Sequence, residues 1–280
     1  HTLSTYFLGI IIYHKFPKIQ NIIDTEIKKY QELNLKSKIN FQYLWYLISI
    51  FHDFGFRYEN DNTFPDLVAF QVGKKKLTVP PATIPHEIAK VWRKYFTFKE
   101  GTRAKCDHGI IGGLFLYAHL RKISPILNKN NKLNPKGLFF GKELYPAFRM
   151  ASWVILSHNI YFIKEKANDA QINSAIHVYK KCGLKSLILQ EKEIPKINFT
   201  EHPFLSLLCL VDTIEPYKIT QTKCNTSSIE NYNIDFMGDK IYLEIKELDK
   251  YRKLCISSMG DWLKVHVVSK ESNNFEISFL

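Results

Sequence analysis

The spacing of apolar and polar residues divides the chain into a long helical part and a shorter part with strands. Up to about residue 221, apolar positions recur with helical spacing. They predict helices at residues 2–13, 24–33, 41–53, 108–122, 143–158, 167–181 and 203–214. The segment 41–53 is apolar almost all round, which is typical of a helix inside the core.

One stretch of this part breaks the helical pattern. Residues 59–83 contain Asn, Pro and Gly and are followed closely by a short helical pattern near 86–95. Clusters of these residue types are typical of loops. We therefore expect an insertion over residues 59–107 that folds over the surface. We also expect this insertion to set the shape of the pocket in which a ligand would bind.

The C-terminal part has a different pattern. Residues 233–246 alternate apolar and polar positions around Gly238-Asp239, which predicts a β-hairpin. A helix is expected at about 247–259, followed by short strands at 264–269 and 274–280. These elements make a β-β-α-β-β module that is small for independent folding, so we expect it to dock on the helical domain.

These patterns together predict a mainly α fold, with a helical domain at residues 1–221 and a small α+β module at residues 222–280. The chain has 280 residues, of which 45% are hydrophobic. This is enough apolar surface for one large core or a large and a small one, and it excludes a disordered chain. No uninterrupted apolar run approaches the roughly 20 residues that span a bilayer, so we expect no membrane partner.

The cysteines indicate a reducing compartment. Five are scattered along the sequence, form no CxxC pair and leave an odd thiol. The first residues are apolar but end in no small-residue cleavage site, so a secretory signal is not expected. We therefore expect a cytoplasmic protein.

The charge is strongly positive but spread along the whole chain. There are 39 Lys and Arg residues against 27 Asp and Glu, which gives a formal charge of +12. Only six of the basic residues are Arg, the side chain that makes bidentate contacts with phosphate and guanine. The nearest clusters, at residues 74–76 and 240–253, are typical of solvated faces. A nucleic-acid partner stays open but is not favoured, whereas an anionic substrate is.

The first candidate functional residues are His52 and Asp53, which lie next to each other at the end of the apolar segment 41–53. Burying an ionised carboxylate beside an imidazole costs several kcal/mol unless something compensates it. A metal ion compensates directly, because it places positive charge where both side chains converge. The alternative is a histidine and an aspartate that solvate each other at a helix end, and the pair alone favours that alternative.

Similar residues occur on the other apolar helices. His1 precedes the first helix, His108 begins DHGIIGGLFLYAHL, His158 ends ASWVILSH, and Asp212 lies within SLLCLVDTIEP. Each residue has a simple local explanation, but ligands that converge at the centre of a helical bundle explain the whole set. The two adjacent glycines of the second segment fit this interpretation, because they would let helices approach closely near a shared site.

This order of residues resembles a known family. The pattern His…His-Asp…His…His…Asp, with the motifs FHDFG, DHGIIGG and LLCLVDTIEP, resembles the HD-domain superfamily of metal-dependent phosphohydrolases over roughly residues 1–221. The resemblance implies an HD-type helical bundle that holds one or two divalent metal ions. One departure is Phe56 after Gly55, where the family often has lysine, so members that use that lysine are poorer guides.

The resemblance also assigns ligands position by position. It implies two sets: His1, His52, Asp53 and Asp212 for one ion, and Asp53, His108 and His158 for the second. In this arrangement Asp53 bridges the two ions. Mixed histidine and carboxylate ligation suits Mn, Fe, Co, Ni or Zn better than Mg, which prefers oxygen ligands.

Other residues have candidate roles around this site. Asp53 and Glu59 are the candidate catalytic residues. Glu59 would act as a general base or as a carboxylate that contacts the metal ligands without binding the ion. The alternative is that Glu59 is an exposed loop residue. Arg57 and Arg103 flank the expected site in sequence and are candidate phosphate-binding residues, as is Lys218.

We therefore predict an enzyme that hydrolyses a nucleotide or another phosphoester with one or two divalent ions. Such ions lower the pKa of a bound water from about 15.7 towards 7 and stabilise charge on phosphoryl oxygens. Three alternatives stay open. They are a metal-dependent nuclease on single-stranded nucleic acid, as in the CRISPR-associated relatives that the chain also resembles, a mixed-valence di-iron oxygenase of the same superfamily, and a non-enzymatic module that senses a nucleotide or binds another protein.

The remaining histidines have simpler explanations. His119 is interpreted as a core or boundary residue, and His202 as the residue that enters a helix. Four histidines in polar or strand contexts are expected at the surface: His14, His86, His177 and His266. Asp107 is expected to cap the helix that follows it.

Overall fold

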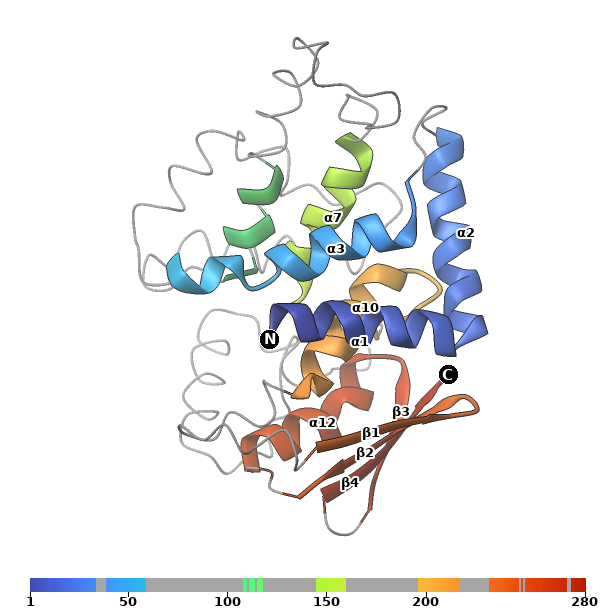
Figure 1. The fold of residues 1–280 in the computed structure, drawn as a ribbon, viewed down its shortest axis with the longest axis vertical. Coiled ribbons are helices and arrows are strands. Elements are labelled where there is room, and N and C mark those ends of the chain that lie inside the picture. The colour runs from blue at the N-terminus through green and yellow to red at the C-terminus, as the bar shows by residue number, and fades with distance from the viewer. Residues whose placement is uncertain are drawn as a thin grey trace. The chain divides into compact units, whose positions relative to one another are not determined.

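Figure 1 shows the fold of the chain, taken from a computed structural model. The residues described are 1–33, 39–58, 108–109, 111–113, 115–117, 145–159, 196–216, 232–246, 248, 250–270 and 273–280. The chain divides into two compact units, residues 1–20 with 160–280 and residues 21–159. The predicted insertion at 59–107 and the predicted helix at 167–181 lie outside the described residues, and the predicted boundary near residue 221 stays a prediction.

The elements follow the predicted order, with helices first and the sheet last. They are α1 (Thr2–Lys15), α2 (Pro17–Leu33), α3 (Phe41–Phe51), the 3-10 helix η1 (Phe54–Tyr58), α7 (Tyr145–Ser157), α10 (Pro203–Ile214), β1 (Tyr232–Met237), β2 (Lys240–Ile245), α12 (Lys250–Trp262), β3 (Val265–Lys270) and β4 (Asn274–Phe279). Helical backbone also covers residues 108–109, 111–113 and 115–117. The mainly helical fold and the β-β-α-β-β order are therefore confirmed. Within the described ranges, no helix combines the length and the apolar character that crossing a membrane requires.

Helix α2 begins well before its predicted start at residue 24. Pro17 occupies its first position, where the missing N–H leaves no helical hydrogen bond unmade and the fixed φ of proline suits a helix. Ile19, Ile23 and Ile27 recur every four residues and are buried. This apolar stripe extends the helix upstream of the predicted segment.

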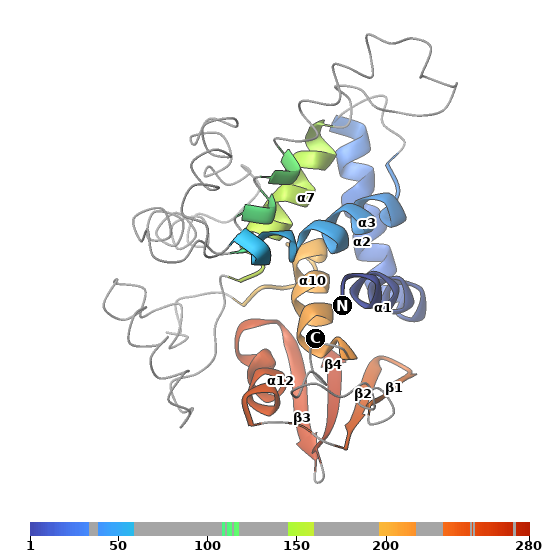
Figure 2. The ribbon, with the colours of Figure 1, turned by 60° about the vertical axis from the view of Figure 1, so that its left-hand side comes forward.

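In the unit of residues 1–20 and 160–280, α10 packs against both α1 and α12. Every residue of α10 from Pro203 to Val211 is buried, which explains why its sequence lacks a polar stripe. Helix α12 packs against β3, and Figure 2 shows it alongside the sheet. At the end of α1, Phe16 contacts Phe279 edge-on with ring centroids 4.7 Å apart, so this helix is also joined to the sheet.

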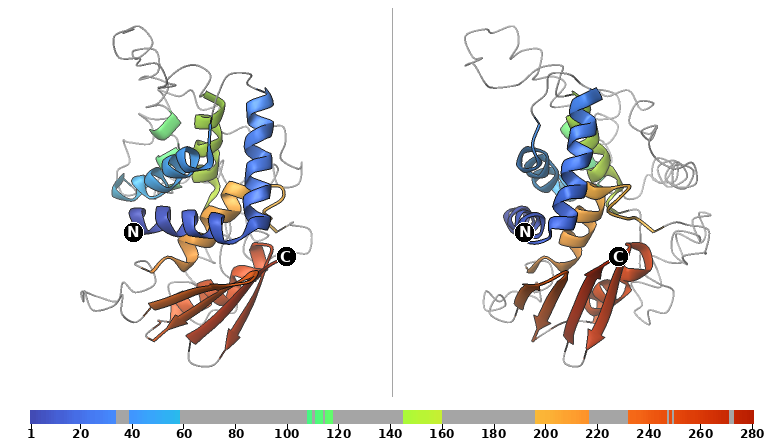
Figure 3. Two further views of the ribbon diagram at one scale, coloured as in Figure 1. Left: turned by 45° about the vertical axis from the view of Figure 1, so that its right-hand side comes forward. Right: turned by 90° about the vertical axis from the view of Figure 1, so that its right-hand side faces the viewer.

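The four strands form one antiparallel sheet in the order β1-β2-β4-β3 (Figure 3). On its apolar face, Ile241 pairs with Ile277 and Leu243 pairs with Phe275, and all four side chains are buried. The hairpin between β1 and β2 turns at Gly238, whose φ of 61° lies in the region that favours glycine. The predicted hairpin is therefore confirmed with its turn in place.

The opposite face of the sheet carries a charged group on β2, β3 and β4. Lys240 Nζ lies 2.6 Å from Oε1 of Glu276, and Lys270 Nζ lies 2.8 Å from Oε2 of the same carboxylate. The hydrogen bonds from Lys240 and Lys270 lower the pKa of Glu276 to about 2. One carboxylate thus links three neighbouring strands across the exposed surface of the sheet.

Glycines set the distance between helices in the unit of residues 21–159, where α3 packs against α7 (Figure 1). A Cβ atom on Gly112 would overlap the carbonyl oxygen of Phe51, and one on Gly113 would lie 2.6 Å from the carbonyl oxygen of Ser152. Any side chain at either position would therefore push α3 or α7 away. The predicted role of this glycine pair in close helix approach is confirmed.

Replacing Gly112 with Ala is expected to lower the free energy of unfolding by about 1–3 kcal/mol, as overpacking does in other cores. At an ordinary helix position, replacing Gly with Ala raises the free energy of unfolding by up to about 1 kcal/mol. The sign of the change at Gly112 therefore tells whether the neighbouring backbone leaves room for a Cβ atom. Urea unfolding followed by circular dichroism measures it. Arg149→Ala, at an exposed position of α7, is the control and should change stability by less than about 0.5 kcal/mol. An unchanged or higher stability for Gly112→Ala would contradict the packing.

The Glu276 pairs predict a defined pH window. The pKa of Glu276 is lowered from 4.5 in the unfolded chain to about 2 in the fold, so its stabilising effect is complete above about pH 4.5. It is lost as the pH falls towards about 2. Replacing Lys270 with Ala is expected to raise the Glu276 pKa, which a carbon NMR titration of the side-chain carboxyls measures. Lys246→Ala, at an exposed position after β2, is the control; equal Glu276 pKa values in wild type and Lys270→Ala would show that the pair is not formed.

Candidate metal centre

Four predicted ligands of the unit of residues 21–159 come from the ends of three helical segments. His52 caps the C-terminus of α3 and Asp53 follows it in the turn before η1. His108 is the first of the described helical residues 108–109, 111–113 and 115–117, and His158 follows directly after α7. One ligand atom each from Asp53, His108 and His158 lies within 4.8 Å of the other two. These three residues form a cluster that can hold a metal ion.

The two oxygens of the Asp53 carboxylate face two different imidazoles. Oδ2 lies 3.5 Å from Nε2 of His52, and Oδ1 lies 3.5 Å from Nε2 of His108. Both distances exceed the 2.7–3.2 Å that is usual for an N–H···O hydrogen bond. They match the separation of about 3.4 Å between two ligands that each lie about 2.1 Å from one tetrahedral ion. The spacing and the donor atoms therefore fit metal coordination.

The other ring nitrogens are held by backbone carbonyls of the same helices. Nδ1 of His52 lies 2.7 Å from the carbonyl oxygen of Ser49, and Nδ1 of His158 lies 2.6 Å from that of Ile155. A carbonyl only accepts hydrogen bonds, so each Nδ1 carries a proton, and in the neutral imidazole each Nε2 keeps its lone pair. This is the tautomer in which histidine binds a metal through Nε2.

Of the four predicted ligands in this unit, His52 and His158 are buried, and Asp53 and His108 are partly exposed. The ring of Phe56 stacks on that of His108, with centroids 3.8 Å apart. The Asn159 amide lies on another side of His108 and donates to its Nε2 at 2.9 Å. Because that nitrogen has one lone pair, an ion bound to His108 through Nε2 would replace the hydrogen bond from Asn159.

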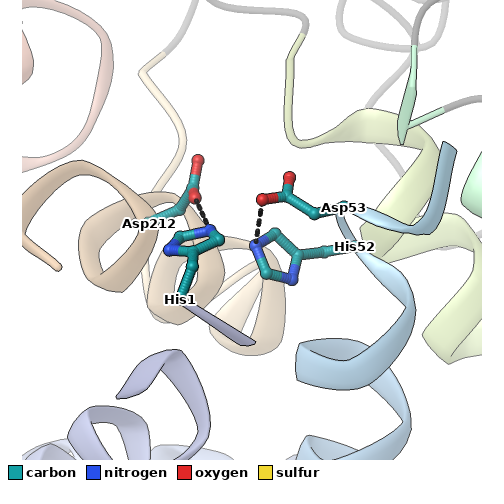
Figure 4. A group of neighbouring side chains, drawn as sticks. All are labelled: His1, His52, Asp53 and Asp212. Atoms are coloured by element: carbon teal, nitrogen blue, oxygen red, sulfur yellow. Dashed lines mark ion pairs between the residues drawn. The ribbon is translucent and has the colours of Figure 1, made fainter. Parts of the chain in front are cut away.

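Two further predicted ligands lie in the unit of residues 1–20 and 160–280. Nε2 of His1, at the N-terminus of α1, lies 3.5 Å from Oδ1 of Asp212 in the last turn of α10. Nδ1 of His1 lies 2.7 Å from Oε2 of Glu215, which is fully buried. Figure 4 shows both histidine–aspartate pairs, each with the imidazole turned toward its carboxylate. In each pair the histidine faces an aspartate at the spacing of two ligands.

The sequence of α10 explains where its acidic residues lie. The apolar run through Val211 places Asp212 in the last turn, and the helix ends at Ile214. Glu215 precedes Pro216, and a residue before proline is restricted to extended backbone. Its φ of −67° and ψ of 129° agree with this restriction, so the proline fixes the point at which the chain leaves the helix.

The structure therefore brings predicted ligands together within each unit. In one unit they are His1 and Asp212, and in the other they are His52, Asp53, His108 and His158. The candidate residues Glu59, Arg103 and Lys218 lie outside the described residues. Arg57 lies in η1, but its side chain is outside the described part of the chain.

Two residues that contact the predicted ligands, Glu215 and Asn159, were not predicted from the sequence. The signal for Glu215 was a negative charge at the C-terminal end of an apolar helix, where a positive charge is favoured. Asn159 follows His158 directly, and an asparagine after a helix is common at helix ends, so its sequence carried no usable signal.

The other histidines described lie where they were predicted. His14 and His266 are exposed. His202 is the N-cap residue of α10, and burial lowers its pKa. The positions of His86, His119, His177 and Asp107 lie outside the described residues.

The comparisons with known proteins found no relative of the chain. No protein-family model, curated protein or solved structure matches the chain.

Replacing His108 with Ala is expected to weaken metal binding by the Asp53–His108–His158 cluster by more than about 100-fold. The loss of a ligand should exceed the 10–100-fold effect of losing a residue that only supports one. Metal content after dialysis against Mn²⁺, Co²⁺ or Zn²⁺ measures the effect. His14→Ala, at an exposed position of α1, is the control. Equal metal content in His108→Ala and wild type would remove His108 from the site.

Proposed function

We propose that the chain is a metal-dependent hydrolase that cleaves a phosphoester. The observation that supports this proposal most strongly is the Asp53 carboxylate, whose oxygens each lie 3.5 Å from a different histidine Nε2. The His158 imidazole completes a three-residue cluster around it. The resemblance to HD-domain phosphohydrolases connects this type of cluster with phosphoester hydrolysis.

We propose two ions for the complete site. The Asp53, His108 and His158 cluster would hold one of them. His1, His52, Asp53 and Asp212 would hold the other, as the resemblance implies. Mn, Fe, Co, Ni or Zn suits these nitrogen and oxygen donors better than Mg.

A divalent ion in this set would supply Lewis acidity for a phosphoryl oxygen and a lower pKa for a bound water. The chain's own contribution is the arrangement of its donors. The neutral imidazoles of His52 and His158 present Nε2 because their Nδ1 protons are held by the carbonyls of Ser49 and Ile155. Asp53 supplies the negative charge between the histidines. These fixed donors need no rearrangement when charge develops on the substrate.

The substrate of the proposed reaction is an anionic phosphoester, with a nucleotide as one candidate. The formal charge of +12 favours approach of an anion. Arg57, Arg103 and Lys218 are the proposed contacts for phosphoryl oxygens, and Glu59 is the proposed general base. Nucleic acid is not favoured as the substrate, because the basic residues are spread out and few of them are arginine.

Replacing Asp53 with Ala is expected to abolish metal retention and to lower hydrolysis of bis(p-nitrophenyl) phosphate by about 10³-fold or more. The metal supplies several kcal/mol of transition-state stabilisation in such reactions. The helical far-UV circular dichroism signal should persist. Asp53→Asn keeps the shape of the side chain and removes its charge, so it serves as a second variant. Asp235→Asn, at an exposed position of β1, is the matched control.

Full activity in Asp53→Ala would overturn the proposed function. Three other results would each favour a specific alternative. An oxygenase would contain iron and would turn over its substrate only with oxygen. A nuclease would degrade single-stranded DNA and would bind it much more weakly as the salt concentration rises. A wild-type protein that retains no ion under any loading condition indicates a binding module without catalysis.

A further inference from the structure

We propose that Glu215 is a positioning residue that holds His1 in the orientation and protonation state of a metal ligand. This inference rests on the proposed function, because it takes His1 as a ligand. Nδ1 of His1 lies 2.7 Å from Oε2 of Glu215. An ionised carboxylate only accepts hydrogen bonds, so Nδ1 donates and Nε2 keeps its lone pair. That lone-pair nitrogen is the atom that faces Asp212 at 3.5 Å.

Glu215 lies at a position where an anion is disfavoured. It follows the last residue of α10, where the helix dipole favours cations over anions. Its side chain is also fully buried, and a buried carboxylate is costly unless a positive partner compensates it. The N–H of His1 supplies part of that compensation, and a cation held by His1 would supply more. The hydrogen bond with His1 is thus one interaction that offsets the cost of this buried carboxylate.

A hydrogen bond also holds the backbone of the residue that precedes Glu215. Tyr232 on β1 donates its hydroxyl hydrogen to the carbonyl oxygen of Ile214 at 2.6 Å. Burial, and then the negative charge of Glu215, raise the pKa of Tyr232 from a value that already keeps the hydroxyl protonated at neutral pH. Together with Pro216, this bond sets the backbone on both sides of Glu215. The first strand of the C-terminal sheet thereby supports the residue that orients His1.

In the other unit, the histidines are also oriented by a hydrogen bond from Nδ1, but to a different kind of acceptor. His52 and His158 use backbone carbonyls as partners of Nδ1, and no substitution removes a backbone carbonyl. In His1 the partner of Nδ1 is the side chain of Glu215, which a substitution can remove. A carboxylate also makes the imidazole a stronger ligand than a neutral carbonyl does, and losing such a partner usually costs 10–100-fold in metal affinity.

The test compares Glu215→Ala and Glu215→Gln in a His108→Ala background, which leaves the His1 set as the remaining proposed site. Glu215→Ala is expected to weaken Co²⁺ binding by about 10–100-fold. Glu215→Gln should weaken it less, because its amide oxygen can still accept from Nδ1. Glu201→Gln, an exposed acid just before α10, is the matched control and should leave the affinity unchanged.

A second measurement needs no metal. Nitrogen NMR of the histidine side chains reports which ring nitrogen of His1 carries the proton. It should show the Nδ1–H form in the wild type and in Glu201→Gln, and a shift towards the Nε2–H form in Glu215→Ala. A structural contact that does not orient the imidazole would leave this balance unchanged.

The outcomes separate this inference from the proposed function. Unchanged Co²⁺ affinity and an unchanged His1 tautomer in folded Glu215→Ala would overturn the positioning role and leave the proposed function intact. A wild-type chain that binds no divalent ion would overturn the proposed function, and the positioning role in metal binding with it. If Glu215→Ala does not fold, the same two measurements on Glu215→Leu decide, because leucine fills a similar volume and offers no acceptor to Nδ1.

Discussion

The candidate site depends on one carboxylate that faces two imidazoles at once. The oxygens of Asp53 lie 3.5 Å from Nε2 of His52 and of His108. Neither distance is that of a hydrogen bond, and in the neutral imidazoles the Nε2 atom that each histidine turns toward Asp53 carries the lone pair. A cation between these atoms would offset the negative charge of the carboxylate. The other features of this unit, from the ends of its helices to its glycines, serve to keep these three groups in place.

The backbone does most of this positioning. Gly112 and Gly113 let backbone atoms of neighbouring helices meet directly, and backbone has no rotamers to lose or to choose among. His52 and His158 are then oriented by carbonyls three residues earlier in their own helices. Side chains with several rotamers could not hold ligand atoms with the same accuracy. The C-terminal sheet contributes in the other unit through the bond between Tyr232 and Ile214.

Much of the fold could be predicted because its signals are local. An apolar run with helical spacing gave α1, α3 and α10 close to their observed bounds, and alternation around Gly238 gave the first hairpin. The start of α2 was missed because its upstream stripe of isoleucines is interleaved with polar residues. Glu215 could not be predicted as a partner of His1, because the two are 214 positions apart and only the fold brings them together. The roles of the candidate residues at 59–107 depend on a segment whose sequence has no regular periodicity.

The histidine bonds to the last helical turn have a kinetic consequence. Because Nδ1 of His52 is bonded to the carbonyl of Ser49, three residues back in α3, the orientation of the ring depends on that single turn. Opening of one turn is a local fluctuation with a much lower free energy than global unfolding. Brief fraying of this last turn, against which Gly112 packs, would therefore release His52 from a bound ion. The rate of that release would depend on one helical turn, whereas the equilibrium affinity would depend on the whole ligand set.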